Sequence, residues 1–168
     1  MSAFPLTRRS ALCALALSPA VAVRKALAQP GVRFRDIVVD VSPLRASLGD
    51  PTAAWVEKEL PGALAQALGA YMAPGDRHGA TLVARVDDLY LGPNNSGTGP
   101  WGASQDTING TLLVKGPQGG IASSAPIRAI TSYHPMGVDQ PLRTESNYWR
   151  VVALTQAFAG WAPRELGL

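Results

Sequence analysis

The stretch DTINGTLLVKG, residues 106–116, decides the fold class, because apolar and polar side chains alternate along it. Alternation with a period of two is typical of a strand that has one buried face and one face in water. One face carries Ile108, Gly110, Leu112 and Val114, and the other carries Thr107, Asn109, Thr111 and Lys115. The polar face predicts a sheet that helices cover on one side only.

Three further strands are expected around this one, over residues 32–42, 80–91 and 121–133. All three are rich in β-branched and apolar residues. The first is expected to be covered on both sides or bulged near Asp36. In the second, the apolar phase changes after Asp87 and Asp88, which indicates a β-bulge. The last contains Pro126, which cannot donate to a ladder and so predicts an edge strand, and residues 116–120 predict the hairpin turn before it.

Two helices complete the pattern, over residues 51–72 and from Thr144 towards the end of the chain. Asp50 and Pro51 predict the first helix start, with Asp50 as the N-cap, and Pro61 predicts a kink or two abutting pieces. We expect the tryptophans of these helices, Trp55, Trp149 and Trp161, to be core or core-edge residues. The order is β-α-β-β-β-α, which predicts an α+β two-layer sandwich, a mixed four-stranded sheet with two helices on one face.

The start of the chain has the pattern of an export signal. The uncharged run over residues 10–23 follows two arginines and precedes Ala26-Leu27-Ala28, an A-x-A cleavage site. At 14 residues the run is shorter than the roughly 20 that a membrane-spanning helix needs. It also has no polar face, which argues against a first amphipathic helix. We therefore expect a cleaved signal peptide, residues 1–28, and a single α/β domain, residues 29–168.

The segment Thr7-Arg8-Arg9-Ser10-Ala11-Leu12 resembles a twin-arginine signal, with Ala11 where an aromatic residue is usual. The resemblance covers the first 28 residues and implies a bacterial protein exported by the twin-arginine route, hence periplasmic or secreted. A lipid anchor at Cys13 is not expected, because Leu12 occupies the place of the small residue in a lipobox. No stable membrane anchor is therefore expected after cleavage.

Removal of residues 1–28 changes the charge balance of the chain. The full sequence has 15 Lys+Arg and 12 Asp+Glu, and the signal contains four of the basic residues and no acid. The mature chain would then have 11 basic and 12 acidic residues, which argues against a nucleic-acid partner. The only cysteine also leaves with the signal, so we expect no disulfide and no thiol chemistry.

In topology alone, the β-α-β-β-β-α order resembles the periplasmic domains of two groups. These are the lipopolysaccharide-assembly lipoproteins and the auxiliary components of lipid-exporting ABC transporters. The resemblance covers the whole expected domain and implies an accessory role in envelope assembly. No diagnostic motif carries it, so no functional residue is transferred.

The residues that could carry chemistry are few. His78 and His134 could form a metal or hydrolase site with Asp76 or Asp139, and Ser132 could join His134 and Asp139. Neither histidine has a His or Cys partner at a ligand spacing, and no G-x-S-x-G elbow is present. The Gly-rich residues 92–102 lack a phosphate-binding motif. We expect no cofactor and no metal.

The segment between the second and third strands is the best candidate for a binding element. Fourteen residues separate Leu91 from Asp106, far more than a hairpin requires, and loops of that length are usually functional or disordered. Asn94, Asn95 and Trp101 are the candidate partner-binding residues, although Trp101 could instead cover the open face of the sheet or a helix end.

Two functions are compatible with these observations. The favoured one is an exported, non-catalytic binding or envelope-assembly accessory domain, whose partner is an unknown periplasmic protein or an apolar ligand. The alternative is a small periplasmic hydrolase or metal-dependent enzyme that uses His134, His78 and nearby acids.

Overall fold

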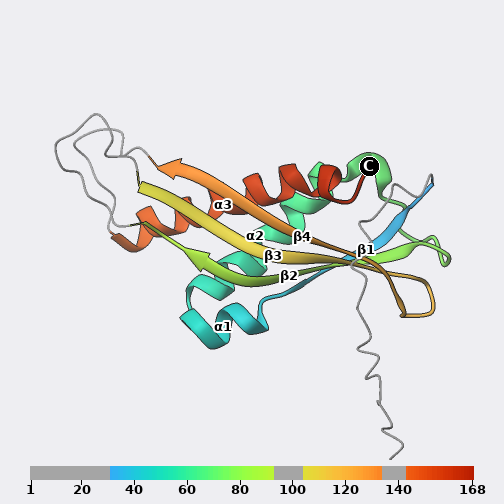
Figure 1. Ribbon diagram of the computed structural model, residues 1–168, viewed down its shortest axis with the longest axis horizontal. Helices are drawn as coiled ribbons and strands as arrows, with labels where there is room; N and C mark the ends of the chain where they lie inside the picture. Colours follow the sequence, from blue (N-terminus) through green and yellow to red (C-terminus); the bar gives the residue numbers. More distant parts are fainter. Residues whose placement is uncertain (1–30, 93–103, 134–142) are drawn as a thin grey trace, which may run out of the picture.

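Four strands form one mixed sheet in the order β1-β2-β3-β4, as a computed structural model shows (Figure 1). The structure describes residues 31–92, 104–133 and 143–168. β1 (Phe34–Asp40) pairs in parallel with β2 (Ala80–Tyr90). β3 (Ser104–Lys115) and β4 (Ile121–Tyr133) extend the sheet in antiparallel fashion. β1 and β4 are the edges, which confirms the edge position predicted from Pro126.

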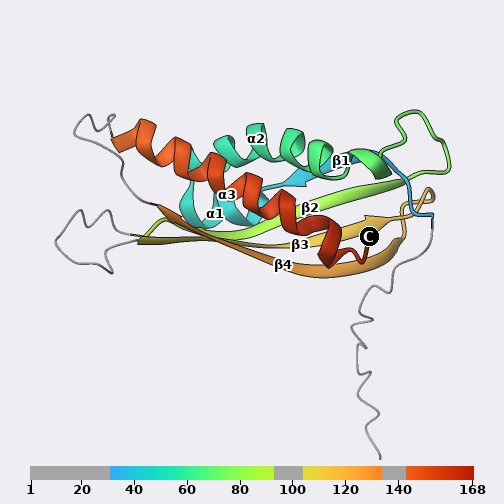
Figure 2. The ribbon, with the colours of Figure 1, turned by 90° about the horizontal axis from the view of Figure 1, so that it is seen from above.

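The helices lie on one face of the sheet (Figure 2). The two long helices are α2 (Thr52–Ala67) and α3 (Arg143–Glu165). A short helix, α1 (Ser42–Leu48), lies between β1 and α2, and a 3-10 turn, η1 (Gly69–Tyr71), lies between α2 and β2. α2 and α3 pack against each other, and α3 also crosses β3 and β4. The α+β two-layer sandwich expected from the sequence is confirmed, with α1 as an addition to the expected order.

The core fills the space between the sheet and the helices. Leu112 of β3 and Phe158 of α3 are fully buried in it, together with Leu44 of α1. Ile108, Gly110 and Val114 are buried on the same face as Leu112, whereas the alternate positions Thr107, Asn109, Thr111 and Lys115 are only half-buried. The period-two reading of residues 106–116 is therefore confirmed, because only one face of β3 meets the helices.

Gly110 sits in the middle of β3 because backbone and side chain crowd it from two sides. A Cβ at this position would clash with the carbonyl oxygen of Arg85 on β2 and would lie 3.2 Å from Phe158 Cε2 on α3. A residue without a side chain is what allows α3 to pack closely on the sheet here.

Two of the three register shifts between the described strands lie where the sequence indicated bulges. The register between β2 and β3 shifts between Val86 and Asp88, which leaves Asp87 as the extra residue. The register between β1 and β2 shifts between Phe34 and Asp36. After the bulge at Asp87, Leu89 points into the core again, and it is 3% exposed. The change of apolar phase in this strand is thereby explained.

α2 differs from expectation at its start and at Pro61. The helix begins at Thr52, its cap position is Pro51 without a side-chain hydrogen bond, and Asp50 instead accepts a hydrogen bond from Arg45. The helix also continues through Pro61 rather than dividing into two pieces. Leu60 and Leu64, on either side of the proline, are both fully buried, so packing stabilises the helix across the lost hydrogen bond.

The tryptophans are less buried than expected. Trp55 is half-buried, but Trp149 is 57% exposed and Trp161 is 44% exposed, so the expectation of a core or core-edge position is wrong for both residues of α3. None of the helices in the described ranges combines the length and the apolar character that crossing a membrane would require.

Candidate functional site

The candidate site lies at the end of the sheet where β2 stops and β3 starts. Gly92 follows β2, Asp106 lies near the start of β3, and the sequence between them holds Asn94, Asn95 and Trp101. These three predicted residues lie outside the described residues, so the site is described through the side chains at its base. The last residues of β4 and the first turn of α3 lie at this same end (Figure 1).

A buried ion pair ties this end together. Arg150 of α3 and Asp106 of β3 have side-chain exposures of 3% and 0%. Arg150 Nε donates to Asp106 Oδ2 at 2.8 Å, and Arg150 Nη2 contacts Asp106 Oδ1. This fork-to-fork geometry makes an arginine–carboxylate pair directional as well as strong.

The pair also holds the backbone of Gly92. Arg150 Nη2 donates to the Gly92 carbonyl oxygen at 2.6 Å, and the Gly92 N–H donates to Asp106 Oδ1 at 3.0 Å. A further hydrogen bond runs from Arg150 Nη1 to Asn147 Oδ1 at 3.3 Å. We call Gly92, Asp106 and Arg150 the buried clamp. It joins the residue before the 93–103 segment and a residue just after it to the same point on α3.

Sequence reasoning missed the buried clamp, although a signal for it exists. Asp106 is in phase with Ile108, Gly110 and Leu112, so the period-two pattern already assigns this carboxylate to the helix-covered face. Arg150 is likewise next to Val151 and four residues before Leu154, both fully buried. A charged residue in a buried phase needs a partner, because burying an unpaired charge is costly.

Of the two histidines of the alternative function, the structure describes only His78. His78 lies in the turn before β2, where its N–H donates to Asp76 Oδ1 at 2.9 Å. His134 lies outside the described residues but directly follows Tyr133, which pairs with Ser104 at the opposite end of the sheet. The ten residue steps of β2 separate these ends by roughly 33 Å, at about 3.3 Å per residue. The described residues next to the two histidines in sequence therefore lie at opposite ends of the sheet.

The other residues considered for chemistry are placed separately. Ser132 is exposed on β4, while Asp139 lies outside the described residues. Asp87 forms an ion pair with Arg85 at 2.8 Å and accepts a hydrogen bond from Thr111, so it belongs to the bulge. Asp88 is exposed beside it. In the described part of the chain, no three His, Cys, Asp or Glu residues come together as metal ligands.

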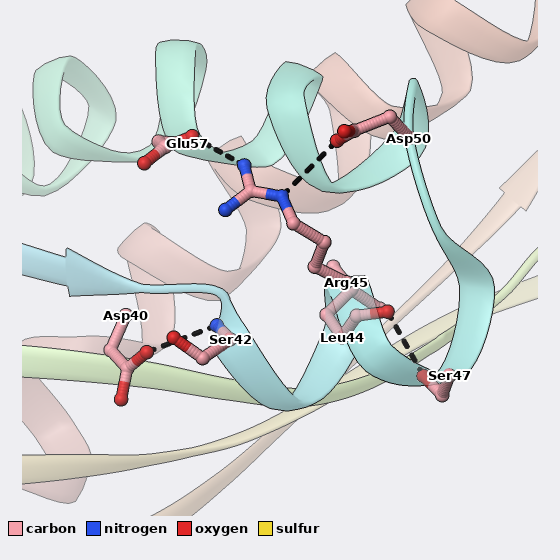
Figure 3. A network of polar contacts seen from close by, with 7 residues as sticks. All are labelled: Asp40, Ser42, Leu44, Arg45, Ser47, Asp50 and Glu57. Atoms are coloured by element: carbon pink, nitrogen blue, oxygen red, sulfur yellow. Dashed lines mark hydrogen bonds and ion pairs between the residues drawn. The ribbon is translucent and has the colours of Figure 1, made fainter.

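A second polar network surrounds α1 and lies in solvent (Figure 3). Arg45 Nη2 donates to Glu57 Oε2 at 2.7 Å and Arg45 Nε donates to Asp50 Oδ1 at 3.2 Å. Asp40 accepts a hydrogen bond from the backbone N–H of Ser42 at 3.0 Å, and this bond is the main cause of a lowered pKa of Asp40. We call Arg45, Asp50 and Glu57 the exposed network. It joins α1 to α2 and leaves no group positioned for catalysis.

A third cluster connects α2 to α3 near the start of both helices. The Tyr148 hydroxyl donates to Glu59 Oε1 at 2.7 Å, which lowers the pKa of Glu59. Trp55 meets the Tyr148 ring edge-on at 5.8 Å between centroids, and Tyr148 meets Trp149 at 5.3 Å. Lys58 Nζ lies 5.5 Å from the Tyr148 ring centroid. These contacts orient an aromatic side chain, Trp149, whose indole is largely in solvent.

By its fold, the protein belongs to the class of α+β two-layer sandwiches with a mixed four-stranded sheet. No protein-family model and no curated protein sequence matches the chain. Among solved structures, the chain is similar to a minor lipoprotein from Acinetobacter baumannii, at 16% identity and a TM-score of 0.44. That match covers 80% of this chain and 93% of the other. The function is therefore argued from the residues of this chain.

Proposed function

We propose that the chain is a non-catalytic accessory domain of the bacterial envelope, which binds a protein or an apolar ligand outside the cytoplasm. Residues 1–28 would serve as a twin-arginine signal, and residues 29–168 would form the mature domain. The binding surface would be the end of the sheet that carries Asn94, Asn95 and Trp101.

The observation that carries this proposal is the buried clamp. Three elements that are distant in sequence meet in it, and two of its residues flank the 93–103 segment. Binding residues often lie in connecting segments whose ends a rigid scaffold positions. A buried charge pair is a costly way to fix a strand end, because burying two charges requires near-complete compensation. Its position at the base of a long, tryptophan-bearing connection supports a role in presenting that connection.

The binding hypothesis is tested through Trp101, with Trp161 as the matched control. Both are tryptophans, but Trp161 is exposed on α3 and outside the proposed surface. The purified chain, Trp101→Ala and Trp161→Ala are each immobilised and incubated with a periplasmic extract. We expect Trp101→Ala to lose the recovered partner and to keep its melting temperature within about a degree or two, and Trp161→Ala to keep the partner.

Two results would contradict the proposed binding surface. If Trp101→Ala lowered the free energy of unfolding by several kcal/mol, the indole would be packing against its own domain, as a large buried aromatic does. The same recovery from both variants would also contradict the hypothesis, because Trp101 would then contribute nothing specific.

Export is tested separately at Arg8 and Arg9. We expect Arg8→Lys combined with Arg9→Lys to stop export, since a receptor reads the arginine pair as an address. The purified double variant should unfold at the same urea concentration as the original chain. Arrival of the double-Lys protein in the periplasm of a strain without the twin-arginine machinery would show that another route is used.

A further inference from the structure

The outer face of α3 carries a stripe of exposed residues with regular spacing. All residues of this stripe are exposed, and none of them belongs to the buried clamp. The stripe consists of Glu145, Trp149, Ala153, Gln156, Gly160 and Arg164. The steps of four, four, three, four and four residues keep them on one side of an α-helix, within an arc of about 100°. Over 19 residue steps the stripe is about 28 Å long.

The spacing of the stripe is the same from either end, and the residues at matching distances from its two ends are complementary in charge or in size. A two-fold axis between positions 154 and 155 would place a second α3 antiparallel to the first. Glu145 would then lie opposite Arg164 of the other copy, Trp149 opposite Gly160, and Ala153 opposite Gln156. An acid thus meets a base, and the largest side chain meets the residue that has none. Glu145 and Arg164 form no ion pair with any other residue in the described ranges, although the Arg164 guanidinium lies 5.0 Å from the centroid of the Trp161 ring.

The surface around Gly160 has room for a large side chain. A Cβ built on Gly160 meets no atom within 4 Å. Beside it, a hollow of about 260 Å³ lies between α2 and α3, lined by Ala63, Gln66, Ala67, Gln156, Ala159 and Gly160. The lining contains no charged residue. Its small side chains would let another helix approach to the 8–10 Å interaxial distance of packed helices.

Trp149 has the properties of the group that would fill this hollow. Its indole is 57% exposed, and Tyr148 meets it edge-to-face. Tyr148 is in turn held by Glu59 and Trp55. A tryptophan fixed in this way loses little conformational freedom on binding, which is why preorganised tryptophans are frequent hot spots.

We propose that α3 is a self-association surface, on which a second copy of this chain docks antiparallel and inserts Trp149 into the hollow at Gly160. The symmetry creates two such insertions and two Glu145–Arg164 pairs in one closed dimer. The occupant is a second copy rather than another protein because the complementary charges and the complementary sizes lie on the same stripe. The stripe starts near the end of the sheet that holds the buried clamp, but Gly92, Asp106 and Arg150 are not part of it.

The test is sedimentation velocity of the full chain over a concentration series. A contact made by one helix and a neighbouring hollow is smaller than the roughly 1,600 Å² of a standard interface, so we expect dissociation in the micromolar range. The chain should change from its monomer mass of 17.6 kDa to twice that mass as its concentration rises. Trp149→Ala should weaken the dimer at least about tenfold. Trp161→Ala should weaken it clearly less, because Trp161 lies outside the stripe and touches it only through the Arg164 guanidinium.

Two further variants test the register. Gly160→Leu should also prevent dimerisation, because it fills the hollow, while the helix keeps or gains stability since glycine is a poor helix former. Glu145→Arg alone and Arg164→Glu alone should each weaken the dimer by placing like charges opposite one another. The chain with both changes should recover most of the lost affinity, because each charge again faces its opposite.

Several outcomes would overturn the proposal. They are a monomer at every concentration, equal effects of Trp149→Ala and Trp161→Ala, or no recovery in the double charge variant. A monomer that binds neutral phospholipid vesicles through Trp149 would also overturn it and would make the stripe a membrane-contact face. None of these results depends on the Trp101 experiment, so the two hypotheses can fail separately.

Discussion

The buried clamp and the exposed network use the same chemistry in opposite environments. Each is built on an arginine. Arg150 contacts one carboxylate, Asp106, which is 44 positions away, and Arg45 contacts two, Asp50 and Glu57, which are 5 and 12 positions away. In the clamp, the side chains of Arg150 and Asp106 are 3% and 0% exposed. In the network, the side chains of Arg45, Asp50 and Glu57 are 42%, 64% and 53% exposed.

An ion pair contributes differently to stability in solvent and in the protein interior. In solvent, water and salt compete with the pair, and its loss leaves both charges hydrated. In the interior, the pair gains little over an apolar contact, but the loss of one partner leaves a charge without water. A single substitution in the buried clamp should therefore lower the free energy of unfolding strongly, whereas a single substitution in the exposed network should lower it little.

The largest effect is expected for Arg150→Met. The change leaves Asp106 buried without its partner and removes the donor to the Gly92 carbonyl, so the free energy of unfolding should fall by about 3–5 kcal/mol. A urea titration followed by circular dichroism measures this loss. The control is the combined variant Arg150→Met with Asp106→Leu, which should be less destabilised than Arg150→Met alone because no unpaired carboxylate remains. Equal losses would show that the cost does not come from an orphaned charge.

A much smaller effect is expected for Arg45→Ala in the exposed network. Glu57 and Asp50 stay hydrated when the arginine is absent, so the urea midpoint should stay close to that of the original chain. The same titration, repeated at low and high salt, measures it, and any difference should disappear in high salt. A loss as large as that of Arg150→Met would mean that burial does not separate the two networks.

The smallest effect is expected at Asp40, beside the exposed network. The backbone N–H of Ser42 donates to this carboxylate and lowers its pKa, so the folded state favours the charged form. Its contribution to stability is therefore present above about pH 4, the pKa range of an unfolded aspartate, and is lost as the pH falls through the lower folded value. Urea titrations between neutral and acidic pH should show a slightly shallower acid decline for Asp40→Asn. A steeper decline in the variant would contradict the sign.

The fold was predictable where local patterns suffice. The alternation in residues 106–116 predicted one covered face, the phase change at Asp87 predicted a bulge, and Pro126 predicted an edge. Each of these features depends on backbone sterics or on the two-residue period of a strand, which a short window contains. The candidate residues Asn94, Asn95 and Trp101 stay predictions, as does the signal in residues 1–28.

The errors have physical causes that act between elements. Pro61 can divide an isolated helix into two pieces, but α2 continues through it, because burial of Leu60 and Leu64 outweighs the local cost. The other expectation, a kink at Pro61, stays a prediction. Trp149 was expected in or at the edge of the core because of its size, yet the face of α3 that meets the sheet is already filled by Val151, Leu154 and Phe158. The sequence contains these residues but does not say which of them reach the core first.

By itself, the sequence determined the order of the elements, the covered face of β3 and the edge position of β4, because periodicity and proline chemistry act within a few residues. Only the tertiary structure decided which charges meet. It pairs Asp106 with Arg150 across 44 positions. It also leaves Trp149 57% exposed on α3. These relations depend on how α3 crosses the sheet, and that crossing is set by the packing of the whole core around Gly110 and Phe158.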